Sequence, residues 1–201
     1  MKKSVLITLC TIILSACSAR AVLVTKKVDY DPQSEARIRV YNNNGNATTK
    51  VLSDTSCQDI EDKKKKGISR NPFSKDNMHN GLPKRTLKNI SIGMPLTTSS
   101  VQALQRDSFT DTISFTEQLI IAGKPTFIRG SQFDIYSCDI RGEFTPEAGK
   151  DYEISYGTIE VPESKTGLGC VLFINELVPI TSDDPKVTAK LGKEISYKKC
   201  N

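Results

Sequence analysis

Short, alternating apolar segments separated by Gly- or Pro-containing turns dominate the second half of the chain. From Thr112 to Ile121 the apolar residues recur at every second position, and Glu117 is the one charged residue on that face. Such alternation is typical of a strand with one face against a core. Similar segments follow at 126–129, 133–141, 151–157 and 170–177. Short strands at this spacing predict a mostly β fold, with an antiparallel β-sandwich as the favoured architecture and a barrel as the alternative.

The segment 36–41 (ARIRVY) predicts the first strand of the domain. Its small or branched residues alternate with Arg37 and Arg39, which is the pattern of a half-buried strand. Residues 42–46 are rich in Asn and contain Gly, as turns are, and 48–52 predicts a returning strand. We therefore expect these two segments to form a hairpin.

Helix signals are few, and we expect one to three short helices. Residues 56–66 carry the clearest, because Ser56 and Asp59 have the spacing of a capping box and Gly67 follows the last turn. A second short helix is expected at 98–106. A third is expected at 186–191, with Pro185 at its first turn.

The N-terminus has the layout of an export signal. A short basic start is followed by an apolar stretch of ten residues, 5–14, which is too short for the roughly 20 residues of a membrane-spanning helix. Ser15 and Ala16 then precede Cys17. The tetrapeptide 14–17 (LSAC) resembles the lipobox of bacterial lipoprotein precursors. A plain cleaved signal peptide with an accidental cysteine is the alternative.

The lipobox resemblance implies cleavage before Cys17 and attachment of a diacylglycerol to its thiol, with a further acyl chain such as palmitate on the new N-terminus. It divides the chain into a signal peptide (1–16), a lipidated N-terminus and tether (17–34) and one β-rich domain (35–201). Ser18 follows the cysteine, and by resemblance to Gram-negative lipoproteins a residue other than Asp there favours the outer membrane, facing the periplasm.

Four of the six cysteines remain in the exported domain once Cys10 is removed and Cys17 carries lipid. Disulfides persist in such a compartment, so two bridges are expected, and three pairings are possible. Cys138 and Cys170 both lie in strand-like runs, and we favour a bridge between them. Cys57 and Cys200 would then fasten the end of the chain. The spacing of these cysteines does not resemble a zinc ligand set, and no metal or other cofactor is expected.

Positive charge is concentrated in the segment 58–95, where apolar residues are scattered and an excursion from the core is expected. It holds nine basic and four acidic residues. Clustered cations attract anionic lipid headgroups and acidic proteins, whereas a solvated charged face would explain them without a partner. The candidate anion- or partner-binding residues are Lys63, Lys64, Lys65, Lys66, Arg70, Lys84 and Arg85.

A second resemblance rests on 144–153 (FTPEAGKDYE) followed by 170–173 (CVLF). This turn between strands resembles the hairpins of transthyretin-like sandwiches in small bacterial envelope lipoproteins, and it implies a transthyretin- or immunoglobulin-like fold. Pro146 and Gly149 would build the turn, and Phe144 and Tyr152 would pair beside it. A core aromatic pair explains these residues without a ligand.

Catalytic motifs give no support for an enzyme. The chain has one histidine, His79, which excludes a site with several histidines. Residues 165–167 (KTG) and 196–199 (SYKK) match two elements of penicillin-interacting enzymes, but in the opposite chain order. We therefore expect a non-enzymatic binding or structural module of the envelope, accessory to an envelope or secretion complex, with no nucleic-acid partner. The alternatives are an inhibitor or immunity-type lipoprotein and an envelope hydrolase that uses carboxylates.

Overall fold

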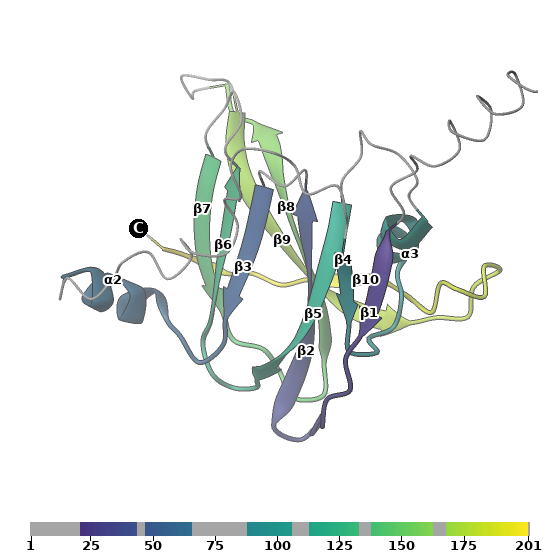
Figure 1. Ribbon diagram of the computed structural model, residues 1–201. Helices are drawn as coiled ribbons and strands as arrows, with labels where there is room; N and C mark the ends of the chain where they lie inside the picture. The colour runs from purple at the N-terminus through teal and green to yellow at the C-terminus, as the bar shows by residue number, and fades with distance from the viewer. Residues whose placement is uncertain are drawn as a thin grey trace, which may run out of the picture.

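Two β-sheets make up most of the fold (Figure 1). The computed structural model describes residues 21–43, 47–65, 88–105, 113–132, 138–162 and 168–200. The larger sheet contains, in spatial order, β1 (Val22–Thr25), β4 (Lys88–Ser91), β5 (Ile113–Ile121), β2 (Glu35–Asn43), β8 (Asp151–Glu160), β9 (Leu168–Pro179) and β10 (Ala189–Glu194). The smaller sheet contains β11 (Lys198–Lys199), β7 (Cys138–Phe144), β6 (Thr126–Gln132) and β3 (Ala47–Leu52). The prediction of a mostly β fold is confirmed.

The larger sheet is mixed, which corrects the expectation of purely antiparallel strands. β1 and β4, β4 and β5, and β2 and β8 are parallel neighbours. The pairs β2–β5, β8–β9 and β9–β10 are antiparallel, as are all pairs of the smaller sheet. Parallel neighbours need a long connection, and β2 pairs with β8 across more than a hundred residues of chain. Local alternation does not encode such a pairing.

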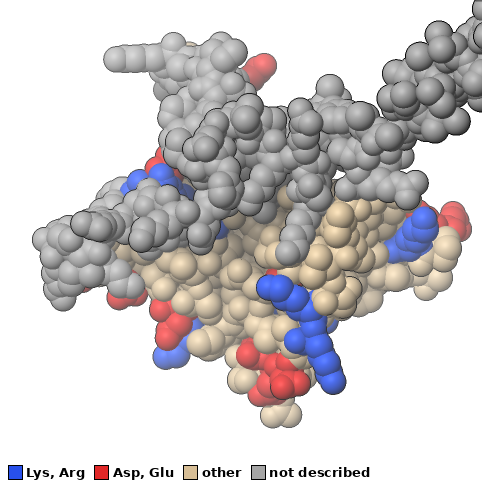
Figure 2. Space-filling view, in the orientation of Figure 1, with Lys and Arg blue, Asp and Glu red and all other residues tan. Residues whose placement is uncertain are grey.

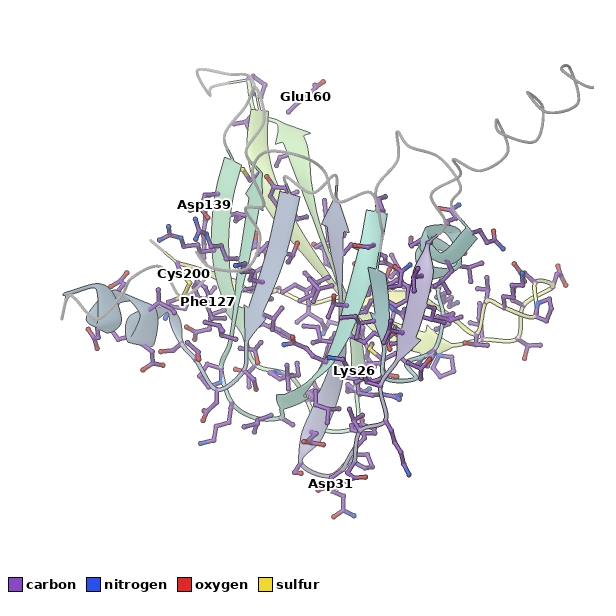
Figure 3. All side chains as sticks on the ribbon, viewed as in Figure 1. Lys26, Asp31, Phe127, Asp139, Glu160 and Cys200 are labelled. Carbon is purple, nitrogen blue, oxygen red and sulfur yellow. A yellow bond between two sulfur atoms is a disulfide. The ribbon has the colours of Figure 1, made fainter. Side chains whose placement is uncertain are left out.

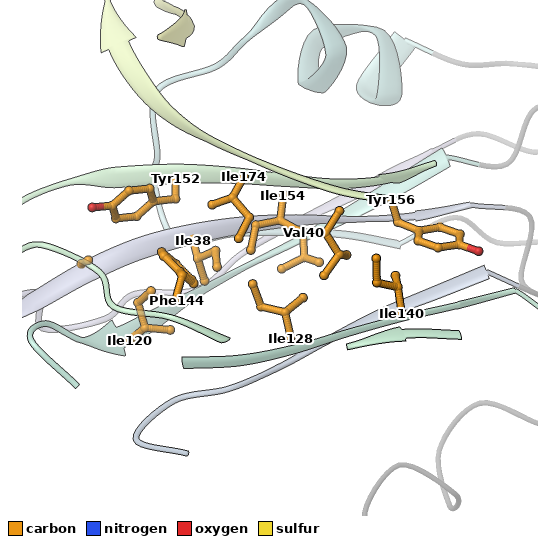
Figure 4. Packing of buried hydrophobic residues seen from close by; sticks show 12 residues of the cluster. Ile38, Val40, Ile120, Ile128, Ile140, Phe144, Tyr152, Ile154, Tyr156 and Ile174 are labelled. Carbon is orange, nitrogen blue, oxygen red and sulfur yellow. The ribbon is translucent and has the colours of Figure 1, made fainter. Parts of the chain in front are cut away.

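Side chains from both sheets share one hydrophobic core (Figure 4). Ile38, Ile154 and Ile174 of the larger sheet and Ile128 of the smaller sheet are fully buried. Burying a side chain of this size contributes about 1.5–3 kcal/mol. In β2 the alternation marks the face turned toward this core, through Ala36, Ile38 and Val40. In β5 the alternating residues Ile113 and Phe115 instead pack against α3 on the other face, and Ile120 faces the shared core.

The hairpin expected from 36–41 and 48–52 is wrong. β2 pairs with β5 and β8 in the larger sheet, whereas β3 pairs with β6 in the smaller one. The two segments are strands as predicted, but they lie in different sheets. Alternation fixes which side chains face the core, while the choice of partner strand depends on contacts far along the chain.

The aromatic pair expected beside the 144–153 turn is present, but it joins the two sheets instead of two paired strands. The ring centroids of Phe144 and Tyr152 are 5.4 Å apart with an interplanar angle of 76°, the favourable edge-to-face arrangement. The hydroxyl of Tyr152 accepts the backbone N–H of Glu147 at 3.0 Å. Gly149 has a φ of 75°, a conformation that favours glycine. The turn thus carries the chain from the smaller sheet to the larger one.

Two helices lie in the described ranges, and both were predicted. α2 (Cys57–Lys65) begins at the expected capping box, in which Ser56 N–H donates to Asp59 Oδ2 at 2.8 Å and Asp59 N–H donates to Ser56 Oγ at 3.1 Å. α3 (Thr98–Gln105) occupies the second predicted position. Both signals depend on residues within one turn of each other, so they can be recognised without tertiary structure.

The third predicted helix, at 186–191, is wrong. Asp184 instead closes a tight turn, because its carboxylate accepts Lys186 N–H at 2.9 Å and its carbonyl accepts Val187 N–H at 3.0 Å. The chain then enters β10 at Ala189. The Asp-Pro signal marks a turn as well as it marks a helix start, and pairing with β9 decides between them.

Parts of the segments expected as tether and excursion belong to the larger sheet. Val22–Thr25, within the expected tether, forms β1, and Lys88–Ser91, within the expected basic excursion, forms β4. The two strands pair in parallel, with Val22 opposite Lys88. The signal peptide and Cys17 lie outside the described residues.

Candidate functional site

A buried arginine lies between two glutamates on the outer face of the larger sheet, away from the shared core. Arg39 of β2 is 0% exposed, Glu117 of β5 is 2% exposed and Glu153 of β8 is 4% exposed. The strand register places Arg39 directly opposite both Glu117 and Glu153. Directly opposite residues face the same side of a sheet, so the pairing alone brings the three charges into one row.

Direct hydrogen bonds join the three charged side chains. Arg39 Nε and Nη2 donate to Glu117 Oε1 at 3.0 and 2.6 Å, and Arg39 Nη1 donates to Glu153 Oε2 at 3.1 Å. Arg39 Nη2 also donates to the carbonyl of Pro95 at 2.8 Å. The guanidinium carbon lies 5.2 Å from the ring centroid of Phe115, a distance that permits a cation–π contact. The guanidinium is therefore held from several directions.

The segment between β4 and α3 covers this row of charges. Glu117 Oε2 accepts hydrogen bonds from Ser91 Oγ at 2.9 Å, from Ile92 N–H at 2.8 Å and from Met94 N–H at 3.2 Å. Thr97 Oγ1, just before α3, donates to Glu153 Oε2 at 2.9 Å. Each carboxylate therefore binds both Arg39 and part of the segment between β4 and α3.

Burial and charge act on Arg39 in opposite directions. Burial is the largest single effect and would lower the pKa of Arg39, but the charges and hydrogen bonds of its acidic neighbours, Glu117 first among them, together outweigh it, and the pKa is raised. Burial raises the pKa of neighbouring Tyr41, and the negative charge of Glu153 raises it further. At neutral pH the site therefore holds a charged guanidinium and a neutral phenol.

A hollow of about 200 Å³ lies beside the cluster, on the side of α3. Its lining residues are Tyr41, Ser99, Gln102, Ala103, Ile113, Glu153, Ser155 and Leu191. Pockets for organic ligands usually measure about 300–1,000 Å³, so this one suits a few waters or a small polar group. Within this lining Glu153 is the single acidic residue, and its Oε2 already accepts from Arg39 and Thr97. The lining offers hydroxyl and amide groups for binding, without a second carboxylate for acid–base catalysis.

Most of the site residues expected from the sequence lie outside the part that the structure describes. These are Cys17 and the side chains of Lys63, Lys64, Lys65, Lys66, Arg70, Lys84 and Arg85. The backbone of residues 63–65 belongs to α2. Lipidation and the basic binding site therefore stay predictions.

One of the two expected disulfides is confirmed. Cys57 at the start of α2 is bonded to Cys200 after β11, with Cα atoms 5.5 Å apart and a sequence separation of 143. The labelled Cys200 marks this bond in Figure 3. Cys170 is also disulfide-bonded. The side chain of Cys138 lies outside the described residues, so the Cys138–Cys170 pairing stays a prediction.

The sequence reasoning missed the buried cluster. Alternation along 36–41 placed Arg39 on the polar side of a half-buried strand, and no second covering layer was expected there. A signal was present in Glu117, a lone charge on a face that otherwise alternates apolar residues. A buried carboxylate needs a cation or several donors, so Glu117 could have been used to look for an arginine on another strand.

Comparisons with family models, curated proteins and solved structures found no match. In the described ranges, no group of three or more His, Cys, Asp or Glu residues is arranged to hold a metal ion. None of the helices found there combines the length and apolar character needed to cross a membrane. The candidate site therefore rests on its own geometry.

Proposed function

We propose that this chain is the precursor of a lipid-anchored lipoprotein of the cell envelope. Its mature domain would be a β-sandwich of transthyretin- or immunoglobulin-like type that acts as a non-enzymatic binding or structural module. The observation that carries the proposal is the tetrapeptide 14–17, which ends in Cys17. It lies at the end of an apolar stretch that is itself preceded by a basic start. Several acyl chains on one cysteine give stable attachment, whereas a single chain gives marginal binding. Ser18 favours the outer membrane, on the periplasmic side.

The Cys57–Cys200 disulfide supports an exported domain. Disulfides are rare in reducing compartments and persist after export. This one ties the end of the chain, just after β11, to Cys57 at the start of α2. The domain therefore contains a disulfide of the kind that persists in the cell envelope.

The buried cluster supports a structural role over catalysis. A carboxylate that acts as a general acid or base must reach the proton that it transfers. Glu117 is 2% exposed and accepts five hydrogen bonds from Arg39, Ser91, Ile92 and Met94. Its bonding capacity is used inside the protein. We therefore favour a binding module over an envelope hydrolase.

The lipid anchor can be tested by mass spectrometry of the full chain expressed in a Gram-negative host. The expected N-terminal peptide of the mature protein begins at Cys17 and carries a diacylglycerol and an acyl chain. Cys17→Ser should abolish both the modification and labelling by a palmitate analogue. Cys10→Ser is the matched control and should change neither. An unmodified mature protein with another N-terminus would refute the anchor.

The binding role is tested by crosslinking in intact membranes followed by purification of the lipidated protein. A module that serves an envelope complex should bring down one partner in a fixed ratio, and the Cys17→Ser protein should bring down less. Recovery of the wild-type protein alone, under conditions that crosslink known envelope neighbours, would contradict an accessory role.

A further inference from the structure

Among the strands that the structure describes, β1 lies at the edge of the larger sheet, and its first residues are exposed and apolar. Val22 is 42% exposed and Leu23 is 49% exposed. Successive residues of a strand point to opposite faces of the sheet, so both faces of β1 present apolar surface here. Exposed apolar edge strands promote aggregation in water, and proteins usually cover them or charge them. Some other surface is therefore expected to cover this one.

The distance from the expected lipid to β1 identifies that surface. Four residues, 18–21, separate Cys17 from Val22. Five extended steps span at most about 18 Å, whereas a free tether reaching residue 34 would span about 60 Å. The parallel pairing of Val22 with Lys88 and of Leu23 with Asn89 fixes β1 to the body of the domain. Anchoring at Cys17 therefore holds this edge of the sheet near the lipid headgroups.

Two exposed lysines follow β1 directly. Lys26 and Lys27 are both exposed, and Lys26 N–H donates to the carbonyl of Ser91 at 2.7 Å, which holds this part of the chain against β4. Figure 2 shows basic side chains in this region with acidic ones directly beside them, and Figure 3 labels Lys26 and Asp31 there. Lysine side chains near an anionic membrane are attracted to its headgroups.

We propose that β1 docks on the surface of the bilayer that holds the lipid anchor. Val22 and Leu23 contact the boundary between headgroups and acyl chains, and Lys26 and Lys27 contact anionic headgroups. This rests on the proposed lipid attachment and extends it from a flexible tether to a fixed orientation. The start of β5 at Ile113 then faces the membrane, and its far end at Ile121 points away, because β4 and β5 run parallel to β1.

The absence of tryptophan from the sequence permits a direct test. Leu23→Trp introduces a single reporter on β1, and Ile121→Trp introduces its matched control, since Ile121 is also apolar and 44% exposed but lies at the far end of β5. Each protein is purified in its lipidated form and reconstituted in vesicles of phosphatidylglycerol and brominated phosphatidylcholine. Tryptophan fluorescence is compared with that in unbrominated vesicles. Val22→Trp provides a second reporter if Leu23→Trp does not fold.

Bromine quenches tryptophan only at close range, so we expect at least a twofold loss of fluorescence for the β1 reporters and almost none for Ile121→Trp. Equal quenching of the β1 reporters and of Ile121→Trp would overturn the docking. No quenching on β1 would also overturn it, and this is the result expected if a protein strand covers β1 instead. The N-terminal lipopeptide is weighed in the same samples. Lipidation without quenching on β1 would leave the anchor standing and reject the docking, whereas a missing lipid would reject both.

Discussion

Replacing Arg39 with methionine tests whether the buried cluster holds the larger sheet and its cover together. Methionine keeps most of the apolar stem and removes every donor of the guanidinium. Glu117 Oε1 then loses both of its donors from Arg39, at 3.0 and 2.6 Å, and the carbonyl of Pro95 loses its donor at 2.8 Å. Breaking a buried ion pair from one side typically costs about 3–5 kcal/mol, because the remaining charge is left without compensation. Glu117 keeps three donors on Oε2, so we expect about 3 kcal/mol.

Urea unfolding of the mature domain, followed by circular dichroism, measures this loss. Arg141→Met is the matched control, because Arg141 pairs with Asp139 at 2.9 Å with side chains 26% and 32% exposed. Exposed pairs contribute about 0–1 kcal/mol, so this variant should stay near the wild type. Adding Glu117→Gln to Arg39→Met should restore part of the loss, since it removes the uncompensated charge. A loss for Arg39→Met no larger than that for Arg141→Met would refute the reasoning.

Three further predictions concern the disulfide, a helix cap and acid stability. Cys57→Ser opens a bridge across 143 residues and should cost up to about 5 kcal/mol; an unchanged urea midpoint would contradict this. Ser56→Ala removes a capping box and should cost about 1 kcal/mol by the same assay, whereas a cost below about 0.3 kcal/mol would argue against the cap. Burial alone would raise the pKa of Asp139, but hydrogen bonds from two flanking arginines lower it below its ordinary 3.8. Ionised Asp139 therefore stabilises the fold at pH values above 3.8, and this stabilisation is lost as the pH falls through the folded-state pKa of Asp139. Asp139→Asn should lose less stability than the wild type on acidification. Curves of unfolding free energy against pH that run parallel for the two proteins would contradict this.

Local signals predicted the individual elements well. The capping box at Ser56 gave the start of α2, and the alternation from 112 to 121 gave β5 almost to the residue. Such signals involve neighbours within a turn or along one strand, so the chain carries them without reference to its fold. The shortest strands, such as β1 and β4, are too brief to show a period, and sequence reasoning missed them.

Partner choice could not be predicted in the same way. Residues 36–41 and 48–52 look like a hairpin because they are close in sequence, yet β2 pairs with β5 and β8. The Phe144–Tyr152 contact was predicted from a turn between paired strands, and it forms between the two sheets instead. In both cases the residues that face the core are right, while the sheet is decided by packing of strands that lie far apart in the chain.

The sequence by itself determined which residues alternate toward a core, where the helices begin, and which cysteines were available to fasten the chain's end. Only the tertiary structure decided that Arg39 is buried between Glu117 and Glu153, because that burial needs three strands in register and a covering segment from elsewhere in the chain. The same holds for β1, whose pairing with β4 turns part of an expected tether into the edge of a sheet. The charge and hydrophobicity of each residue can be read from the sequence, but its burial depends on which strands and covering segments the fold brings together.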